Sequence, residues 1–207
     1  EPMTMVTDYL ISAEALIFAI LLFRNRNKSA FLNLWVAAFT TISVAAFLGG
    51  TYHGFAFYLQ DSTSMALWIG VVYSLSLYSF LVLSATIINF TPCKFHQLFI
   101  ALVGFKSLFY LYIAGQKDDF IYVIADYISA MVAVLAILSL TFDVNKKTST
   151  VLLIAGILVS FVAAGVQQSG IILAENLNYN DLSHIISLIS FWLLYRGCDI
   201  ICNQTDS

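Results

Sequence analysis

The sequence predicts an all-α integral membrane protein, with residues 1–207 forming a single bundle of seven transmembrane helices. Hydrophobic residues make up 60% of the chain and charged residues only 10%, whereas soluble domains carry about 25% charged residues. The mean hydropathy is +0.89. Seven apolar segments each approach the ~20 residues that a helix needs to cross a bilayer. No soluble domain fits between them.

Each apolar segment ends where a short polar link begins, so the boundaries can be read along the chain in order. The first segment stops at the basic link that starts with Arg24, and the second contains a glycine-rich stretch, Gly49 to Gly54. The expected spans are residues 8–23, 31–57, 65–90, 97–114, 120–142, 150–173 and 181–201. The links are residues 24–28, 59–64, 91–94, 115–119, 143–149 and 174–180.

The charges beside the segment ends predict the orientation. Alternate ends carry the basic residues Arg24, Arg26, Lys28, Lys94, Lys146, Lys147 and Arg196. The opposite links hold one base and several acids, Lys117, Asp61, Asp118, Asp119 and Glu175. Because cytoplasmic links carry the excess of lysine and arginine, the N-terminus is expected outside and the C-terminus inside.

Strongly polar residues gather at one predicted depth, in the outer half of the bundle. They are Glu14, His53, Lys106, Asp126, Gln167, Gln168, Asn180, Asp181 and His184. Ionisable groups are costly inside a membrane and are functional candidates by default. The pattern therefore predicts a polar cavity in the outer half, open to the outside or sideways to lipid.

The last segment carries its polar residues on one side. Asn180, His184 and Ser187 recur at spacings of three and four, with Ser183 and Ser190 close by, so they share one helical face. Leucine, isoleucine and aromatic residues cover the remaining surface of this segment. The polar face is expected to contact other helices and not lipid.

Glycines near the end of the second segment indicate a close helix crossing. Gly50 and Gly54 form a small-xxx-small pair, which lets another helix approach closely. Gly49 lies one turn before His53 on the same face, so the crossing would present the imidazole of His53. Tyr52 could serve as an interfacial anchor or as a hydrogen-bond donor in the cavity.

These features resemble the CREST superfamily, which contains the alkaline ceramidases and the progestin and adipoQ receptors. In that family a histidine of the second helix and an HxxxH motif of the seventh hold a zinc ion that activates water for hydrolysis of a lipid amide. His53 matches the first histidine and His184 the last, with Asn180 in place of the histidine between them. Gly49 stands where the family has a serine, and Asp61 is the possible counterpart of its aspartate near the third helix.

The resemblance implies a zinc site and a set of catalytic roles. Asp181, three residues before His184, would complete three protein ligands, the usual number for catalytic zinc, with Asn180 as a hydrogen-bond partner. The remaining roles would fall to four side chains, with Asp126 or Glu14 moving the proton and Tyr52 or Lys106 stabilising the oxyanion. A structural ion pair among Glu14, Lys106 and Asp126, with one carboxyl protonated, is the alternative for those three residues.

Three classes of function follow. The first is a CREST-like metal-dependent hydrolase that cleaves a lipid amide or ester. The second is a noncatalytic seven-helix receptor or lipid-binding protein with a degenerate metal site, and the third is a transporter or proton pathway, for which the inner half supplies few polar residues. A retinal pump is not expected, because the last segment has no lysine to form the Schiff base. The expected partner is a membrane lipid, as substrate or ligand, and not a nucleic acid; the lipid and the oligomeric state stay open.

Overall fold

The computed structural model describes residues 1–24, 29–116, 120–142, 147–172, 174 and 177–204. Its long helices are α1 (Pro2–Arg24), α2 (Ala30–Phe55), α3 (Asp61–Phe90), α4 (His96–Gln116), α5 (Ile121–Leu140), α6 (Lys147–Ser169) and α7 (Tyr179–Gln204). Short 3-10 helices, η1 (Ala56–Tyr58) and η2 (Cys93–Phe95), follow α2 and precede α4. Within these described residues, seven helices are long and apolar enough to cross a membrane, so the protein is a multi-pass integral membrane protein and the all-α expectation is confirmed.

The helix boundaries differ from the expected spans at two places that matter for the site. Helix α1 begins at Pro2 and not at residue 8, so Thr4, Thr7 and Asp8 all lie within it. Helix α6 ends at Ser169 and not at residue 173, because Gly170 adopts a φ of 66°, the left-handed conformation that commonly ends helices. The expected orientation rests partly on charges that lie outside the described residues: Arg26, Lys28, Lys117, Asp118, Asp119, Lys146 and Glu175.

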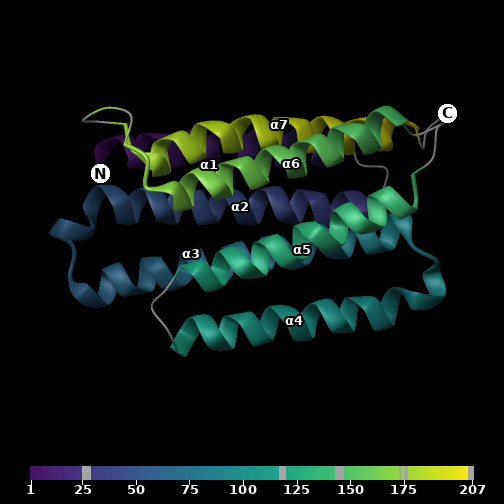
Figure 1. The fold of residues 1–207 in the computed structure, drawn as a ribbon, viewed down its shortest axis with the longest axis horizontal. Coiled ribbons are helices and arrows are strands. Elements are labelled where there is room, and N and C mark those ends of the chain that lie inside the picture. Colours follow the sequence, from purple (N-terminus) through teal and green to yellow (C-terminus); the bar gives the residue numbers. More distant parts are fainter. Residues whose placement is uncertain (25–28, 117–119, 143–146, 173, 175–176, 205–207) are drawn as a thin grey trace.

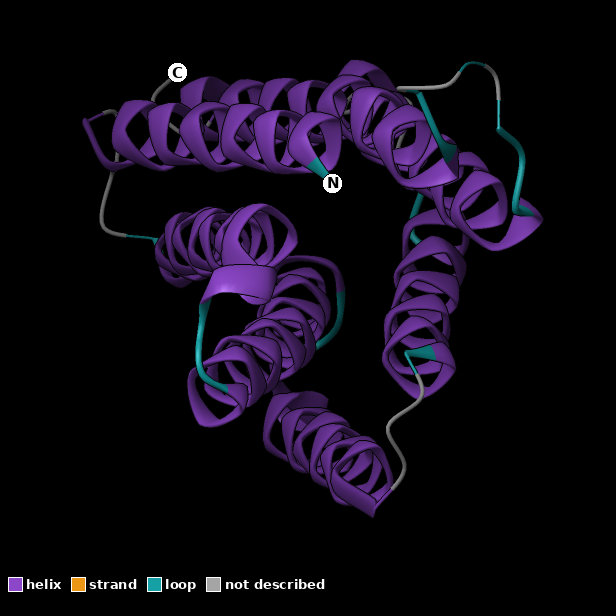
Figure 2. Cartoon of the chain, turned by 90° about the vertical axis from the view of Figure 1, so that its left-hand side faces the viewer, coloured by secondary structure: helices purple, strands orange, loops and turns teal. Residues whose placement is uncertain are grey.

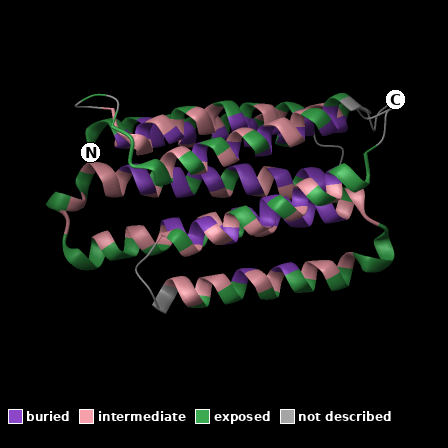
Figure 3. Ribbon diagram, viewed as in Figure 1, coloured by how far each residue is buried: buried purple, intermediate pink, exposed green. Residues whose placement is uncertain are grey.

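The seven helices lie roughly side by side (Figure 1). Viewed from the end where α1 begins, they surround a common centre, with α4 at the edge (Figure 2). The most extensive contacts join α6 to α7, α1 to α2 and α2 to α3, whereas α5 and α6 contact each other much less. Helix α4 packs mainly on α3 and α5 and is largely exposed (Figure 3), as expected for a helix that faces lipid.

Small residues allow the closest of these crossings. At Gly50 an added Cβ would lie 2.9 Å from Cε1 of Tyr9 on α1, which confirms that the glycine-rich stretch of α2 admits another helix and identifies that helix as α1. Further along the same pair, Ser12 Oγ donates to the Ser43 carbonyl (2.9 Å) and Ser43 Oγ donates to the Ser12 carbonyl (2.8 Å). The α1–α2 crossing thus brings the N-terminal part of α1 against the glycine face of α2.

Aromatic side chains fill the interior of the bundle. Trp35, Phe39 and Tyr78 are almost fully buried. The rings of Phe18 on α1 and Tyr195 on α7 stack with centroids 4.4 Å apart. The Phe18–Tyr195 stack joins α1 to α7, and α1 also packs extensively on α2, so α1 lies against both helices.

Candidate functional site

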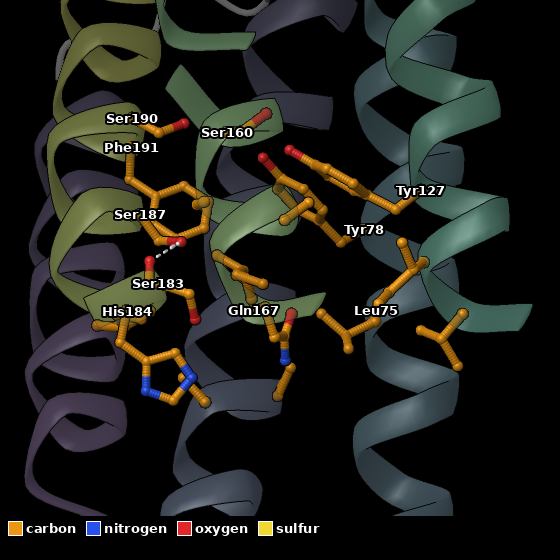
Figure 4. Close-up of a pocket in the computed structure, with 18 of the residues that line it drawn as sticks. Leu75, Tyr78, Tyr127, Ser160, Gln167, Ser183, His184, Ser187, Ser190 and Phe191 are labelled. Atoms are coloured by element: carbon orange, nitrogen blue, oxygen red, sulfur yellow. Dashed lines mark hydrogen bonds between the residues drawn. The ribbon is translucent and has the colours of Figure 1, made fainter. Parts of the chain in front are cut away.

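A cavity of about 180 Å³ lies at the centre of the bundle, between α1, α2, α3, α5, α6 and α7 (Figure 4). Its walls are mostly apolar and include Ile11, Ile42, Leu75, Val123 and Ala163. Polar side chains lie at two levels. We call these the α1 end, near the beginning of α1, with Asp8, Gln167 and His184, and the deep end, with Tyr78, Tyr127, Ser160 and Ser190.

At the α1 end, His184 lies between two side chains of α1. Its Nδ1 is 2.9 Å from Thr7 Oγ1, and its Nε2 is 3.6 Å from Asp8 Oδ1. Asp8 is buried, and its Oδ2 has no hydrogen-bond partner among the described residues. Gly49 provides the space for this carboxyl group, because a Cβ there would lie 3.3 Å from Asp8 Oδ2. The α1 end therefore offers an unsatisfied acceptor beside an oriented imidazole.

At the deep end, the hydroxyls of Tyr78 and Tyr127 both point toward Ser160 (Figure 4). Tyr78 is 1% exposed, and its hydroxyl has no hydrogen-bond partner among the described residues. The serines nearby are already donating: Ser160 Oγ to the Ile157 carbonyl at 2.7 Å and Ser190 Oγ to the Gly156 carbonyl at 2.8 Å. The Tyr78 phenol is thus a donor without an acceptor, inside a cavity.

The polar face of α7 contacts the interior, as predicted. Ser183 and Ser190 are buried, and both line the cavity together with His184 and Ser187. The Ser187 hydroxyl donates to the Ser183 carbonyl at 2.8 Å. Each of these serine hydroxyls donates to a backbone carbonyl, whereas the His184 ring faces Thr7 and Asp8, so His184 is the residue of this face that joins the cavity to α1.

Asp181 lies in the first turn of α7 and forms hydrogen bonds with both α7 and α1. Asn178 Oδ1 accepts from the backbone N–H of Asn180 (2.8 Å) and of Asp181 (3.2 Å), and Asp181 Oδ2 accepts from the Asn178 N–H (2.9 Å). This is the reciprocal arrangement of a capping box at the start of α7. The other oxygen, Oδ1, accepts from Thr4 Oγ1 at 2.8 Å. Asp181 therefore caps α7 and joins it to α1.

His53 lies near this cluster but outside the cavity lining. Its Nδ1 is 3.3 Å from Glu1 Oε2, and Thr4 Oγ1 is 3.2 Å from the same oxygen. Tyr52 packs against Trp68 of α3, with ring centroids 5.6 Å apart. Both residues thus belong to the α1 end of the bundle without lining the cavity.

The remaining predicted catalytic residues lie elsewhere. Lys106 of α4 forms an ion pair with Asp126 of α5, with Nζ 2.8 Å from Oδ1, so this part of the predicted structural pair is present. Neither residue lines the central cavity. Glu14 of α1 is half-buried and outside the cavity lining. Within the described residues it forms no ion pair with Lys106, and its buried Oε2 has no hydrogen-bond partner.

The residues expected to hold zinc do not form a ligand set in this structure. Over the described ranges, no group of three His, Cys, Asp or Glu side chains lies close enough to hold a metal ion. Both oxygens of Asp181 accept hydrogen bonds, and the Nε2 of His184 faces Asp8. Catalytic zinc requires three converging protein ligands. His53, His184, Asp181 and Asn180 share an end of the bundle without converging on one point.

Two of the best-placed residues were not among the sequence candidates. Asp8 is the first residue of the expected first span, and hydropathy does not indicate its burial. The polar residues Thr4, Thr7 and Asp8, at spacings of three and four, are the signal that places it on a buried helical face. Tyr78 is one of 11 tyrosines. Nothing in its sequence context distinguishes it from those at the membrane interface.

Comparison with known proteins gives the chain a family. No curated protein and no solved structure matches it. The model of a family described as a family of unknown function, DUF6962, matches residues 3–203. Since this match covers nearly the whole chain, from the beginning of α1 to the end of α7, the protein belongs to the DUF6962 family.

Proposed function

We propose that the protein is a seven-helix membrane receptor or lipid-binding protein, and that its ligand is a small amphiphile held in the central cavity. The observation that carries this proposal is the cavity itself, with apolar walls and a few polar groups at defined positions. Ligand sites in proteins have this composition, because apolar walls supply affinity and polar groups fix orientation. From α5 and α6 the lining includes the apolar residues Val123, Ile124, Ala163 and Ala164 and the aromatic residue Tyr127.

A route from the bilayer to the cavity is supported by the packing. Helices α5 and α6 both line the cavity, yet they contact each other far less than α6 contacts α7. An amphiphile dissolved in the membrane would therefore enter between α5 and α6. Its binding would bridge α1 and α7, since Asp8 and His184 come from these two helices. That bridge gives the ligand a means of changing how α1 and α7 pack.

The orientation in this proposal places the α1 end of the bundle outside. Among the described residues Arg24, Lys94 and Arg196 are basic and lie toward the opposite end, as the positive-inside rule requires of the cytoplasmic side. We expect a protease cleavage site fused after Ser207 to be cut only when the protease can reach the cytoplasmic side of the membrane. Cutting by protease added outside intact cells would show that the orientation is the opposite one.

A cavity-filling substitution tests the binding function. Ala163 is buried and lines the cavity, so Ala163→Phe should occupy part of the ligand space. We expect the wild-type protein, purified in mild detergent, to retain a co-purifying amphiphile that mass spectrometry detects, and Ala163→Phe to retain at least about tenfold less, a loss of ~1.4 kcal/mol in binding. The matched control is Ala101→Phe on the exposed surface of α4. Equal ligand content in all three proteins would contradict the proposal.

A hydrolase is the second candidate, and the contact between Asp8 and His184 favours it. A carboxylate that orients an imidazole is a common arrangement for a general base that takes a proton from water or from a nucleophile. No step is assigned to zinc here, because the predicted ligands do not converge. The same mass spectrometry separates the two candidates: an intact amphiphile indicates binding, whereas cleavage products that disappear in His184→Ala indicate hydrolysis.

A further inference from the structure

We propose that the ligand of the central cavity has two polar ends: a hydrogen-bond donor, an amine or a hydroxyl, bound at Asp8, and an uncharged acceptor, a hydroxyl or a carbonyl, bound at Tyr78. This inference rests on the proposed binding function and names the chemical class of its ligand. It is carried by two buried oxygen atoms, Asp8 Oδ2 and the Tyr78 hydroxyl, which have no hydrogen-bond partner among the described residues and belong to residues that line the same cavity.

The α1 end selects a donor. Asp8 is 6% exposed, and its Oδ2 is buried and unpaired in the described part of the chain. A carboxyl oxygen left unpaired in an apolar site is unfavourable, so a ligand N–H or O–H at this position would be bound in preference to a methyl group. His184 Nε2 lies 3.6 Å from the other oxygen, Oδ1, and makes no contact that would satisfy Oδ2. A cationic amine would gain further from the charge of the carboxylate.

The deep end selects an acceptor. Tyr78 donates to nothing among the described residues, and its ring is held in place by Tyr127 (centroids 6.3 Å apart) and by Phe191 (6.1 Å, edge to face). A rigid phenol with an unused O–H recognises a hydroxyl or carbonyl oxygen. Ser160 and Ser190 do not compete for that acceptor, because each already donates to a backbone carbonyl.

The two polar levels are separated by an apolar interval. Along α7, His184 marks the level of the α1 end, and Phe191, which contacts Tyr78, marks the level of the deep end. At 1.5 Å per residue these levels are roughly 10 Å apart along the helix. Ile11, Ile42 and Ala163 line the space between them. The ligand therefore has an apolar middle of about this length, and a lipid tail that ends in a methyl group would leave Tyr78 unpaired.

The test measures binding of three probes to the purified full-length chain in lipid nanodiscs. 8-Amino-1-octanol carries both polar ends on a chain of similar span, whereas octylamine lacks the hydroxyl and 1-octanol lacks the amine. We expect the amino alcohol to bind at least about tenfold more tightly than either single-ended probe, which corresponds to ~1.4 kcal/mol. Tyr78→Phe should abolish its advantage over octylamine, and Asp8→Asn should reduce its advantage over 1-octanol.

Matched controls exclude general effects of the substitutions. Tyr112→Phe removes a phenol from the exposed surface of α4, and Asp61→Asn neutralises an exposed carboxylate at the start of α3. Neither should change the ranking of the probes. If the wild-type protein binds all three equally, the two-ended ligand is wrong while the binding function stands. If it binds none of them and retains no amphiphile, the proposed function itself fails. The order in which the wild-type protein binds the three probes tests the two-ended ligand even if a variant does not fold.

Discussion

Replacing Gly156 with alanine is expected to destabilise the bundle by about 2–3 kcal/mol, in the range of overpacked cores. The added Cβ would lie 2.8 Å from Cγ of Leu194 and 3.1 Å from the carbonyl oxygen of Ser190, so α6 and α7 must separate. That separation would also weaken the hydrogen bond from Ser190 Oγ to the Gly156 carbonyl. The effect is measured by thermal unfolding in detergent, followed by circular dichroism or by loss of the monodisperse peak in size-exclusion chromatography.

Gly165 supplies the control on the same helix. No atom lies within 4 Å of a Cβ built at Gly165, so Gly165→Ala should leave stability unchanged or raise it by up to about 1 kcal/mol through helix propensity. A second substitution, Leu194→Ala, should cost less in the Gly156→Ala background than alone, because it removes the atoms that clash with the added Cβ. If Gly156→Ala unfolds at the same temperature as Gly165→Ala, the close α6–α7 crossing is wrong.

The sequence was sufficient for the fold because the bilayer limits what an apolar segment can do. Backbone polar groups in lipid must bond within their own segment, so a long apolar run can only be a helix. That argument found seven helices and placed most of their ends within a few residues. It failed at the beginning of α1, where Thr4, Thr7 and Asp8 are polar and yet buried against α2 and α7. Hydropathy cannot distinguish such residues from a link.

The site was only partly predictable, because depth in the membrane is one coordinate of three. Glu14, His53, Lys106, Asp126 and His184 were assigned similar depths, but the sequence does not give the rotation of each helix or its neighbours. Among these five, His184 lines the cavity. Lys106 and Asp126 pair with each other beside α3, and His53 contacts Glu1. The residue that His184 does face, Asp8, is 176 positions earlier in the numbering.

Replacing Lys106 with methionine is expected to cost about 3–5 kcal/mol, the usual effect of removing one partner of a buried ion pair. Asp126 is only 2% exposed at its side chain, and Lys106 Nζ is 2.8 Å from its Oδ1 and 2.9 Å from its carbonyl oxygen. Because α4 packs mainly on α3 and α5, the loss should appear first as release of α4. Hydrogen exchange should therefore increase along α4 before the remaining helices respond.

A double substitution distinguishes the effect of losing one charge of the ion pair from the effect of changing the side-chain shapes. Lys106→Met combined with Asp126→Leu removes both charges, so it should recover most of the stability that Lys106→Met loses, since no unpaired carboxylate stays behind. Lys94→Met is the control: Lys94 is exposed near the start of α4 and lies over the Phe95 ring at 4.9 Å, so its loss should cost within about 1 kcal/mol. A Lys106→Met protein as stable as Lys94→Met, with α4 still protected, would show that α4 is held by apolar packing alone.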